Sequence, residues 1–279
     1  MSLTKVRRTM FDVERRFNER FHYPYVFLSE TPFPSEFQKA VRHMAPQSQI
    51  RFGLVEDWVP ENTSLSGYQA MSRYWAYPFV RHPELHGFRY IWRLEPGAHY
   101  PCDIVEDPLD SLGRHNLTYA FGVSVQEPGR EGSARAWRTA LEFSHRYPHL
   151  VENNTLGWLV GARGFNYCQV LTNFEVVDLD FLRSPAYQHL FEFFDSQRGF
   201  FTEGSDATIR SLAISLLLPP QKVRWLSSVG YIHDSLSNCP SGDIQRLCHC
   251  NPAKSSHLLP TSCAAQWAHS SHMDPRKLH

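Results

Sequence analysis

The sequence predicts an α/β fold in which helices cover a largely parallel sheet. Short apolar or aromatic runs alternate with amphipathic segments along most of the chain, which is the pattern of strands and of the helices that cover them. The composition can supply the core, because 42% of the residues are hydrophobic and 14% are aromatic. The 279 residues suffice for one large domain or two small ones, so length alone does not fix the number of domains.

Three strands are predicted in the first 95 residues, each preceded by a helix. Apolar residues from Val6 to Phe21 recur at spacings of three and four, which indicates an amphipathic helix. Two further helices are predicted at 35–45, with Ser35 as its N-cap, and at 67–80. The predicted strands are 23–30, 50–56 and 88–95.

The rest of the chain continues the alternation up to residue 233. Strands are predicted at 119–125, within 167–182 and at 223–233, and helices at 133–147, 185–197 and 206–218. After Cys239 the apolar periodicity is lost, so this part is expected to be loop-like.

Charge and motifs exclude several classes of protein. The 28 basic and 28 acidic residues balance, so no nucleic-acid partner and no anionic membrane surface is expected. No apolar stretch approaches the roughly 20 residues of a membrane helix, and no signal peptide is visible. Walker, GxGxxG, GxSxG and HExxH motifs are absent, which disfavours a kinase, a classical dehydrogenase and a serine hydrolase.

Four of the six cysteines lie close to the C-terminus: Cys239, Cys248, Cys250 and Cys263. The Cys-His-Cys spacing at 248–250 is too tight for the usual zinc knuckle. Structural disulfides are therefore favoured over free thiols and over zinc, and the sequence leaves their pairing open.

Four ionisable residues end or interrupt apolar segments, and each has a structural and a chemical interpretation. Glu95 follows "YIWRL" at the carboxyl end of a predicted strand, where open α/β sheets bind ligands. Glu175 lies inside an extended run and would simply face water if it had no function. Asp206 would otherwise be a helix N-cap, and His233 an ordinary histidine among 15. The residues alone leave both interpretations open.

Six segments nevertheless form a specific signal through their order and spacing along the chain: "YPYVFLSETPF", "RHPEL", "YIWRLEPGAHYPCDI", "TNFEVVDLDFLRSPAYQ", "GYIH" and "NCP…CHCNP". Together they resemble the fungal Golgi α-1,2-mannosyltransferases, the glycolipid 2-α-mannosyltransferase family. The resemblance runs from about residue 12 to about residue 267, so 1–279 is expected to be a single domain with an irregular cysteine-containing tail at 240–279.

The resemblance implies a GT-A-type nucleotide-sugar-binding fold and a retaining transfer of mannose. The implied donor is GDP-mannose, and the implied acceptor is a mannose-terminated O-linked chain, N-linked chain or glycolipid. It implies Mn²⁺ as the cofactor, because a divalent cation bridging both phosphates stabilises the charge that develops on the departing diphosphate. The implied location is the Golgi lumen, where the family is membrane-anchored.

The resemblance also assigns roles to individual residues. Glu95, in the family's Glu-Pro segment, and His233, in its Gly-Tyr-x-His segment, are the implied metal ligands. Glu175 is the implied nucleophile or charge-stabilising carboxylate, as in retaining glycosidases, and Asp206 is a second catalytic carboxylate. The implied donor-binding set is Tyr68, Arg73 and Glu95.

Departures from the family pattern keep a second function open. Gly97 stands where the family has Asp or Asn, and "TEGSDAT" at 202–208 lacks an aromatic and a basic residue near Asp206. The family's membrane anchor, stem and first strand have no counterpart here, so the chain is expected to be N-terminally truncated. The alternative is a catalytically impaired pseudoenzyme or fragment that binds a glycan or a partner transferase. A metal-dependent hydrolase using Glu95 and His233 is a third possibility.

Overall fold

The computed structural model describes residues 2–56, 65–127, 130–151, 156–162, 164–197 and 199–270, and it confirms an α/β architecture. Its helices are α1 (Leu3–Arg16), α2 (Ser35–Met44), α3 (Gly67–Ala76), α4 (Pro108–Arg114), α5 (Arg130–Arg146), α6 (Leu179–Leu182), α7 (Pro185–Asp195), α8 (Phe200–Glu203), α9 (Asp206–Leu217) and α10 (Ala264–Ser270). Its strands are β1 (Tyr25–Ser29), β2 (Ile50–Leu54), β3 (Tyr90–Leu94), β4 (Tyr119–Phe121), β5 (Ser124–Gln126), β6 (Val160–Gly161), β7 (Gly164–Phe165), β8 (Cys168–Val170), β9 (Phe174–Asp178), β10 (Val223–Trp225), β11 (Tyr231–His233) and β12 (Leu236–Asn238).

The central sheet is mixed, so the prediction of a largely parallel sheet was wrong. Its strand order is β10-β4-β9-β3; β10 and β4 are parallel, whereas β9 runs antiparallel to both of its neighbours. The chain re-enters the sheet at the end where β4 leaves it, since Leu171 N–H bonds to Val123 O and Gly122 N–H bonds to Phe174 O. A strand that starts where its neighbour ends must run in the opposite direction.

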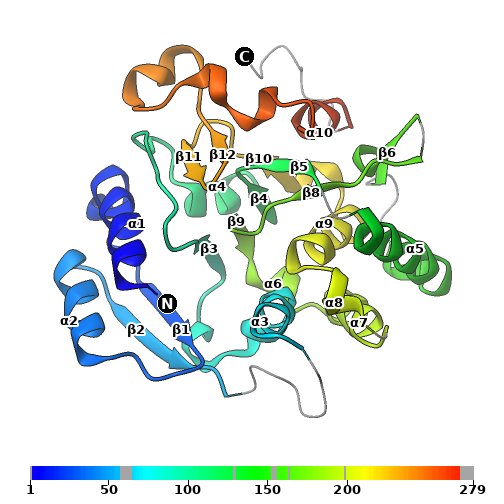
Figure 1. Cartoon of the computed structure of the whole chain (residues 1–279), viewed down its shortest axis with the longest axis horizontal. Helices are drawn as coiled ribbons and strands as arrows, with labels where there is room; N and C mark the ends of the chain where they lie inside the picture. The colour runs from blue at the N-terminus through cyan, green and yellow to red at the C-terminus, as the bar shows by residue number, and fades with distance from the viewer. Residues whose placement is uncertain are drawn as a thin grey trace.

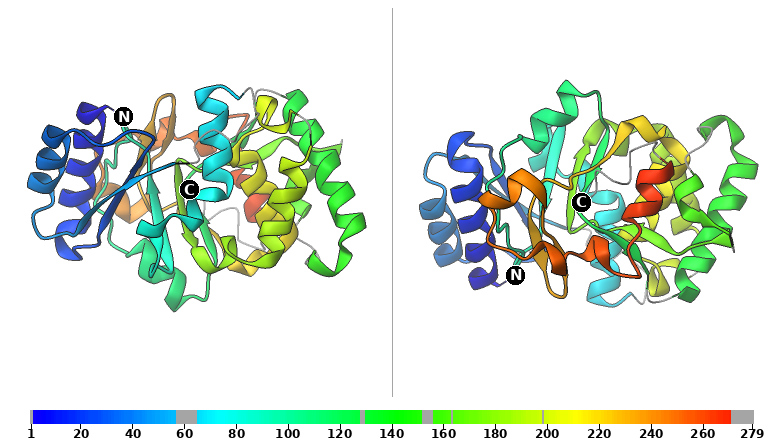
Figure 2. Two further views of the ribbon diagram at one scale, coloured as in Figure 1. Left: turned by 90° about the horizontal axis from the view of Figure 1, so that it is seen from below. Right: turned by 90° about the horizontal axis from the view of Figure 1, so that it is seen from above.

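A second sheet contains only β1 and β2, which pair in parallel. Helices α1 and α2 lie beside this pair at one end of the molecule, and α5 lies at the other end, with the central sheet between them (Figures 1 and 2). Helix α1 connects the two sheets, because its C-cap Phe17 packs edge-on against Trp92 of β3 and stacks on Tyr23 just before β1. One hydrophobic cluster therefore extends from Val6 to the inner face of the central sheet.

Helix α9 is the centre of the other hydrophobic cluster. All twelve of its residues are buried, and it packs against β8, α3, α5 and α7. A helix that is buried on every side belongs in the interior, where its polar side chains need partners. Its one arginine, Arg210, is completely buried and thus requires a buried partner of opposite charge.

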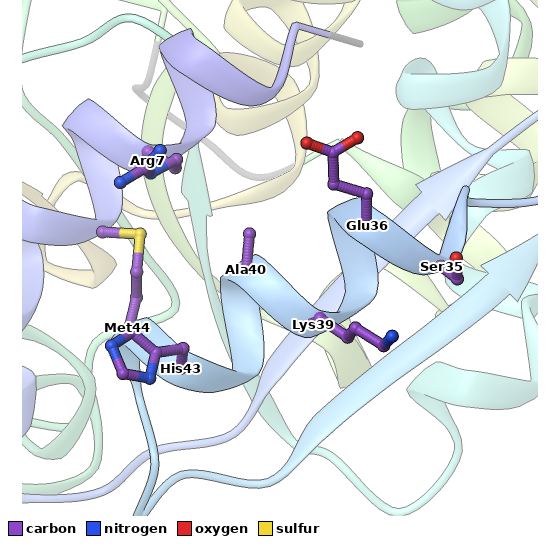
Figure 3. Close-up of a pocket in the computed structure, with 7 residues that line it drawn as sticks. All are labelled: Arg7, Ser35, Glu36, Lys39, Ala40, His43 and Met44. Atoms are coloured by element: carbon purple, nitrogen blue, oxygen red, sulfur yellow. The ribbon is translucent and has the colours of Figure 1, made fainter.

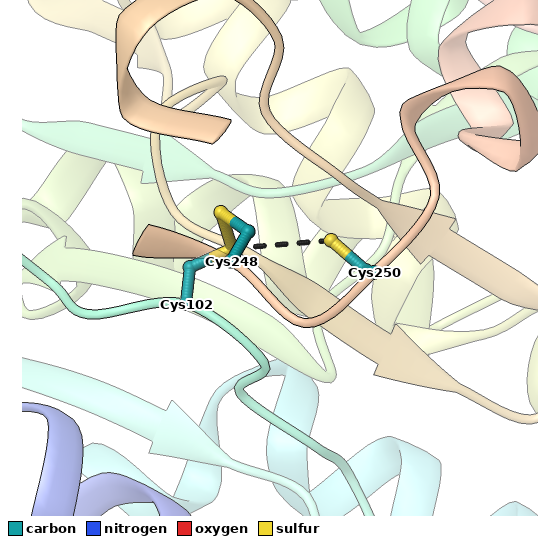
Figure 4. A group of neighbouring side chains, drawn as sticks. All are labelled: Cys102, Cys248 and Cys250. Carbon is teal, nitrogen blue, oxygen red and sulfur yellow. Dashed lines mark hydrogen bonds between the residues drawn. A yellow bond between two sulfur atoms is a disulfide. The ribbon is translucent and has the colours of Figure 1, made fainter. Parts of the chain in front are cut away.

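Three disulfides confirm the favoured interpretation of the cysteines: Cys102–Cys248, Cys168–Cys263 and Cys239–Cys250. Figure 4 shows that the Cys250 sulfur also lies beside the Cys102–Cys248 bond, 3.9 Å from the Cys102 Sγ. Backbone hydrogen bonds from Asp103 to Leu247 and from His249 to Pro101 attach the tail to the loop that follows β3. The tail thus acts as a strap across this end of the sheet (Figure 1).

Several predicted boundaries differ from the structure. Helix α1 ends at Arg16, before Phe21, because Phe17 leaves the helical conformation. Pro34, not Ser35, is the N-cap of α2. The short helix α4 was not predicted, nor was α10 in the supposedly loop-like tail, where Trp267 is buried on Phe121. Helices of seven residues give too few repeats for a periodicity to stand out.

Candidate active site

Four of the predicted site residues, Glu95, Glu175, Asp206 and His233, lie around the point where β3 ends and β9 begins. In the register of these two strands, Arg93 lies opposite Glu175, and Leu94 lies opposite Phe174. Glu95 directly follows β3, and Asn173 directly precedes β9. Directly opposed residues of antiparallel strands share one face of the sheet, so Arg93 and Glu175 lie on the same face. The glutamate predicted to bind the metal therefore follows the strand that pairs with the strand of the predicted catalytic glutamate.

Arg93 holds the acidic residues of the site together. Its Nη1 lies 2.6 Å from Asp206 Oδ2, and its Nη2 lies 3.9 Å from Glu95 Oε2. Its guanidinium also lies over the ring of Trp75, 4.6 Å from the ring centre. Burial disfavours the charged form, but Asp206, Glu175 and Glu95 outweigh it and raise the pKa of Arg93. Arg93 is thus a permanent positive charge among three carboxylates.

Asp206 is the first residue of α9, and Ser205 rather than Asp206 is the N-cap. Its carboxylate accepts hydrogen bonds from Ser72 Oγ at 3.2 Å and from Thr172 Oγ1 at 2.7 Å. Burial alone would raise the pKa of Asp206, yet the charge and hydrogen bond of Arg93 and the hydrogen bond of Thr172 lower it. Asp206 is consequently an ionised carboxylate whose orientation is fixed by several partners.

Glu175 is completely buried and does not face water. Its Oε2 lies 2.9 Å from Nε of Arg210, and its Oε1 lies 3.4 Å from the Nη2 of the same residue. Arg210 also donates to the hydroxyl of Tyr187 and to the carbonyl of Trp75. Glu175 thus neutralises the buried positive charge of Arg210 in α9. The ion pair also holds the carboxylate of Glu175 on the interior side of β9.

His233 ends the first strand of the β11–β12 hairpin. The hairpin is attached to the loop after Glu95, because His99 and Ile232 exchange two backbone hydrogen bonds of 2.8 and 2.9 Å. The Nδ1 of His233 lies 3.3 Å from Nδ2 of Asn173, the residue that directly precedes β9. His233 therefore reaches the strand pair that Glu95 follows, although the two residues are 138 positions apart in the chain.

The donor set at this point fits a divalent cation. The side chains of Glu95 and His233 are 33% and 20% exposed, so each can reach a ligand in solvent. A carboxylate oxygen and an imidazole nitrogen suit Mn²⁺. Beside His233, Oδ1 of Asn173 is buried without a hydrogen-bond partner, which is unusual for an amide. The site therefore contains a buried acceptor that lacks a donor or a cation.

The two remaining predicted residues differ in their positions. Tyr68, in the first turn of α3, is 67% exposed, and its pKa is raised by partial burial of the hydroxyl group and by the charges of Asp206, Glu127 and Glu95. It therefore lies at the rim of the site. Arg73 instead forms a bidentate ion pair with Asp195 of α7, at 2.7 and 2.6 Å, and the structure does not bring it together with Glu95.

Sequence reasoning missed three residues of this site: Arg93, Arg210 and Asn173. Arg93 and Arg210 each interrupt an otherwise apolar segment, "YIWRL" and "IRSLAISLLL". A single charge within a buried element signals a buried countercharge. Asn173 gave no such signal, because asparagine is common where a chain turns into a strand.

A groove of about 490 Å³ lies elsewhere, between α1 and α2. Figure 3 shows its lining, which is Arg7, Ser35, Glu36, Lys39, Ala40, His43 and Met44. It contains none of the predicted site residues.

The described part of the chain has no helix that is long and apolar enough to span a bilayer.

The sequence matches the family model described as glycolipid 2-alpha-mannosyltransferase over residues 1–65 and 57–272. O-glycoside alpha-1,2-mannosyltransferase homolog 2 of Schizosaccharomyces pombe is 32% identical, with 91% of this chain and 74% of that protein aligned. The glycolipid 2-alpha-mannosyltransferase of Saccharomyces cerevisiae is 33% identical, and here 82% of this chain covers 57% of the relative.

Solved structures agree with this match. Core-mannan synthase A from Aspergillus fumigatus, solved in a Mn/GDP form, superposes with a TM-score of 0.88 over 98% of this chain and 82% of that one, at 26% identity. The mannosyltransferase Ktr4p from S. cerevisiae in complex with GDP has a TM-score of 0.88 and 26% identity, over 99% of this chain and 81% of that one.

Proposed function

Because this chain belongs to the glycolipid 2-α-mannosyltransferase family of α-1,2-mannosyltransferases, we propose that it transfers mannose from GDP-mannose to a mannose-terminated glycan with retention of configuration. The observation that carries the proposal is the arrangement of Glu95, Glu175, Asp206 and His233 around Arg93 and Asn173. These residues come from four separate segments of the chain. Three carboxylates and a histidine assembled in this way suit a metal-assisted glycosyl transfer.

In this proposal Glu95 and His233 hold Mn²⁺, which supplies a Lewis acid for the diphosphate of the donor. Glu175 provides negative charge beside the anomeric carbon, and Asp206 fixes Arg93 between the carboxylates. Tyr68 contacts the donor from the rim. We assign Arg73 to donor binding because it lies in α3, the helix that also carries Tyr68. Its ion pair with Asp195 supports this helix.

We further propose a single glycosyltransferase domain across residues 1–279 with a GT-A-type fold. Its support is the superposition on the solved mannosyltransferase structures, which covers 98–99% of this chain. We assign the protein to the Golgi lumen. Three disulfides support an oxidising compartment.

The first test is isothermal titration of GDP in the presence and absence of Mn²⁺. GDP is expected to bind measurably only with Mn²⁺, and Glu95→Ala is expected to abolish this metal-dependent binding while the folded circular dichroism spectrum is retained. Asp103→Ala is a suitable control, since Asp103 lies in the same loop and pairs with Arg16 on the surface. Unchanged GDP binding in Glu95→Ala would refute the metal assignment.

Glu175→Gln tests the catalytic carboxylate separately. This variant is expected to lower kcat by at least about 100-fold with a change in donor affinity of less than about threefold, because the lost charge acts mainly in the transition state. Mannose transfer from GDP-mannose to a mannose acceptor gives kcat, and titration gives the affinity. An equal loss of both would contradict a transition-state role.

One observation favours the impaired enzyme as a second candidate. Glu175 is fully enclosed and is engaged by Arg210, so a covalent role would require it to leave this ion pair. A pseudoenzyme would bind the mannosylated glycan without turnover of GDP-mannose. Acceptor binding in a sample that shows neither GDP binding nor transfer would favour it.

A further inference from the structure

Asn173 is in an unusual position for a buried amide. It is the last residue before β9, and its Nδ2 is the group nearest to Nδ1 of His233, at 3.3 Å. Its Oδ1 is buried and accepts no hydrogen bond. Leaving a buried acceptor unsatisfied costs about 1–3 kcal/mol, so this orientation of the amide is unfavourable.

Rotating the side-chain amide of Asn173 by a half turn exchanges the positions of Oδ1 and Nδ2. The oxygen then has a hydrogen-bond partner in His233. The oxygen and nitrogen of an asparagine amide have nearly the same size, so their assignment follows from the hydrogen-bond network. With Oδ1 turned toward His233, it accepts a hydrogen bond from Nδ1–H of the imidazole. A neutral imidazole protonated at Nδ1 has its lone pair on Nε2, which is then free to bind a metal.

We propose that Asn173 is a positioning residue that accepts a hydrogen bond from Nδ1–H of His233 and thereby presents the Nε2 lone pair to a divalent cation. This inference rests on the proposed function of His233 as a metal ligand. The competing partner of Nδ1 is Asp234 Oδ2, but it lies at 3.5 Å and its side chain is 86% exposed. Water competes for such a carboxylate, so Asp234 cannot fix the tautomer as a buried amide does.

The same rotation also changes which group the amide nitrogen can contact. After it, Nδ2 occupies the place of the unsatisfied oxygen and can donate a hydrogen bond. Glu95 directly follows β3, the strand that pairs with β9, and its carboxylate is the acceptor that we assign to this nitrogen. In the proposal Asn173 thus serves both metal ligands: it accepts from His233 and donates toward Glu95. Such partners of metal ligands typically change metal affinity by 10–100-fold.

Two substitutions at Asn173 separate this role from a structural one. The probe is Mn²⁺ titrated into the full chain with saturating GDP, followed through the electron paramagnetic resonance signal of free Mn²⁺. Asn173→Leu is expected to weaken Mn²⁺ binding by about 10–100-fold. Asn173→Asp retains the accepting oxygen and is expected to stay within about threefold of the wild type. Equal weakening by both variants would mean that the amide donates to Nδ1, and no weakening by Asn173→Leu would also overturn the proposal.

Two controls keep the result interpretable. Asn166→Leu makes the same chemical change at an asparagine that bonds to the backbone of Trp158 and Cys168, and it should lower the melting temperature without changing Mn²⁺ affinity. His233→Ala tests the underlying assignment. If His233→Ala leaves Mn²⁺ affinity unchanged, the proposed metal site itself fails; if it weakens binding and Asn173→Leu does not, only the role of Asn173 fails.

The tautomer can also be read without metal and without any variant. Nitrogen-15 NMR of the neutral imidazole groups in the metal-free protein is expected to show His233 protonated at Nδ1. Protonation at Nε2 instead would overturn the proposal, even if the Asn173 variants did not fold.

Discussion

At the scale of single residues, the buried pair of Arg210 and Glu175 should dominate local stability. Both side chains are fully inaccessible, so removing one partner leaves an uncompensated charge in the interior. Arg210→Met is expected to lower the free energy of unfolding by about 3–5 kcal/mol in urea denaturation. The double variant Arg210→Met with Glu175→Gln should recover part of this loss, because no isolated charge then remains.

A second bidentate pair that is partly exposed provides the control. Arg73 and Asp195 also form a bidentate pair, but their side chains are 20% and 26% exposed. Arg73→Met is therefore expected to cost only about 1 kcal/mol, since solvent already screens this pair. If both arginine variants lost the same amount, burial would not be the deciding factor.

The chemistry of these residues could be foreseen only in part from the sequence. Glu95, Glu175, Asp206 and His233 were identified from where they interrupt apolar segments and from the family resemblance. The contacts that they make were not, because Arg210 and Glu175 are 35 positions apart and meet only through the tertiary packing that buries α9. Periodicity reports which face of an element is apolar, but it does not report which buried charges face each other.

At the scale of elements, the close packing of β4 on β9 depends on Gly122. A Cβ at this position would collide with the ring of Phe174, which neither strand can move aside. Gly122→Ala is expected to lower the free energy of unfolding by about 1–3 kcal/mol through overpacking. Gly113→Ala, in helix α4, should raise it by about 0.5–1 kcal/mol, because the nearest atom is 3.5 Å away and alanine favours the helix. Opposite signs in thermal or urea unfolding would verify this; a loss at both positions would contradict it.

Most of these elements were predictable, but the direction of β9 was not. Every strand predicted from an apolar run contains an observed strand, and helices α7 and α9 were placed almost to the residue. An apolar run reads the same in either direction, so its direction depends on the path of the connection before it. That connection contains α5 and the β5–β8 pair, and it returns the chain to the end of the sheet at which β4 finished.

At the scale of the whole molecule, Cys168–Cys263 joins the tail to the main hydrophobic core. It closes a loop with a sequence separation of 95, and both sulfurs are buried. Replacing both cysteines with serine is expected to cost about 2–5 kcal/mol and to lower the melting temperature. The pair Cys239–Cys250, with a separation of 11, should cost less when replaced, since a short loop restricts the unfolded chain less. A reversed order in calorimetric unfolding would show that loop length does not control the effect.

The pairing of the cysteines is the part of the global structure that the sequence left open. Six cysteines allow fifteen pairings, and the observed ones join residues 146, 95 and 11 positions apart. No local spacing rule selects among them. Tertiary contacts make the choice: an isolated antiparallel bridge brings Cys102 and Cys248 together, and Cys168 of β8 lies beside Cys263 at the start of α10.

The strap formed by the tail restrains the loop on which the proposed metal site depends. Cys102–Cys248 fastens the strap to the loop that begins at Glu95, and the same loop holds the hairpin that carries His233. Because the two cysteines are 146 positions apart, this cross-link limits how far the two halves of the chain can separate in the unfolded state. The segments that carry the two proposed ligands are thus kept within reach of each other by a covalent bond as well as by the hydrogen bonds between His99 and Ile232.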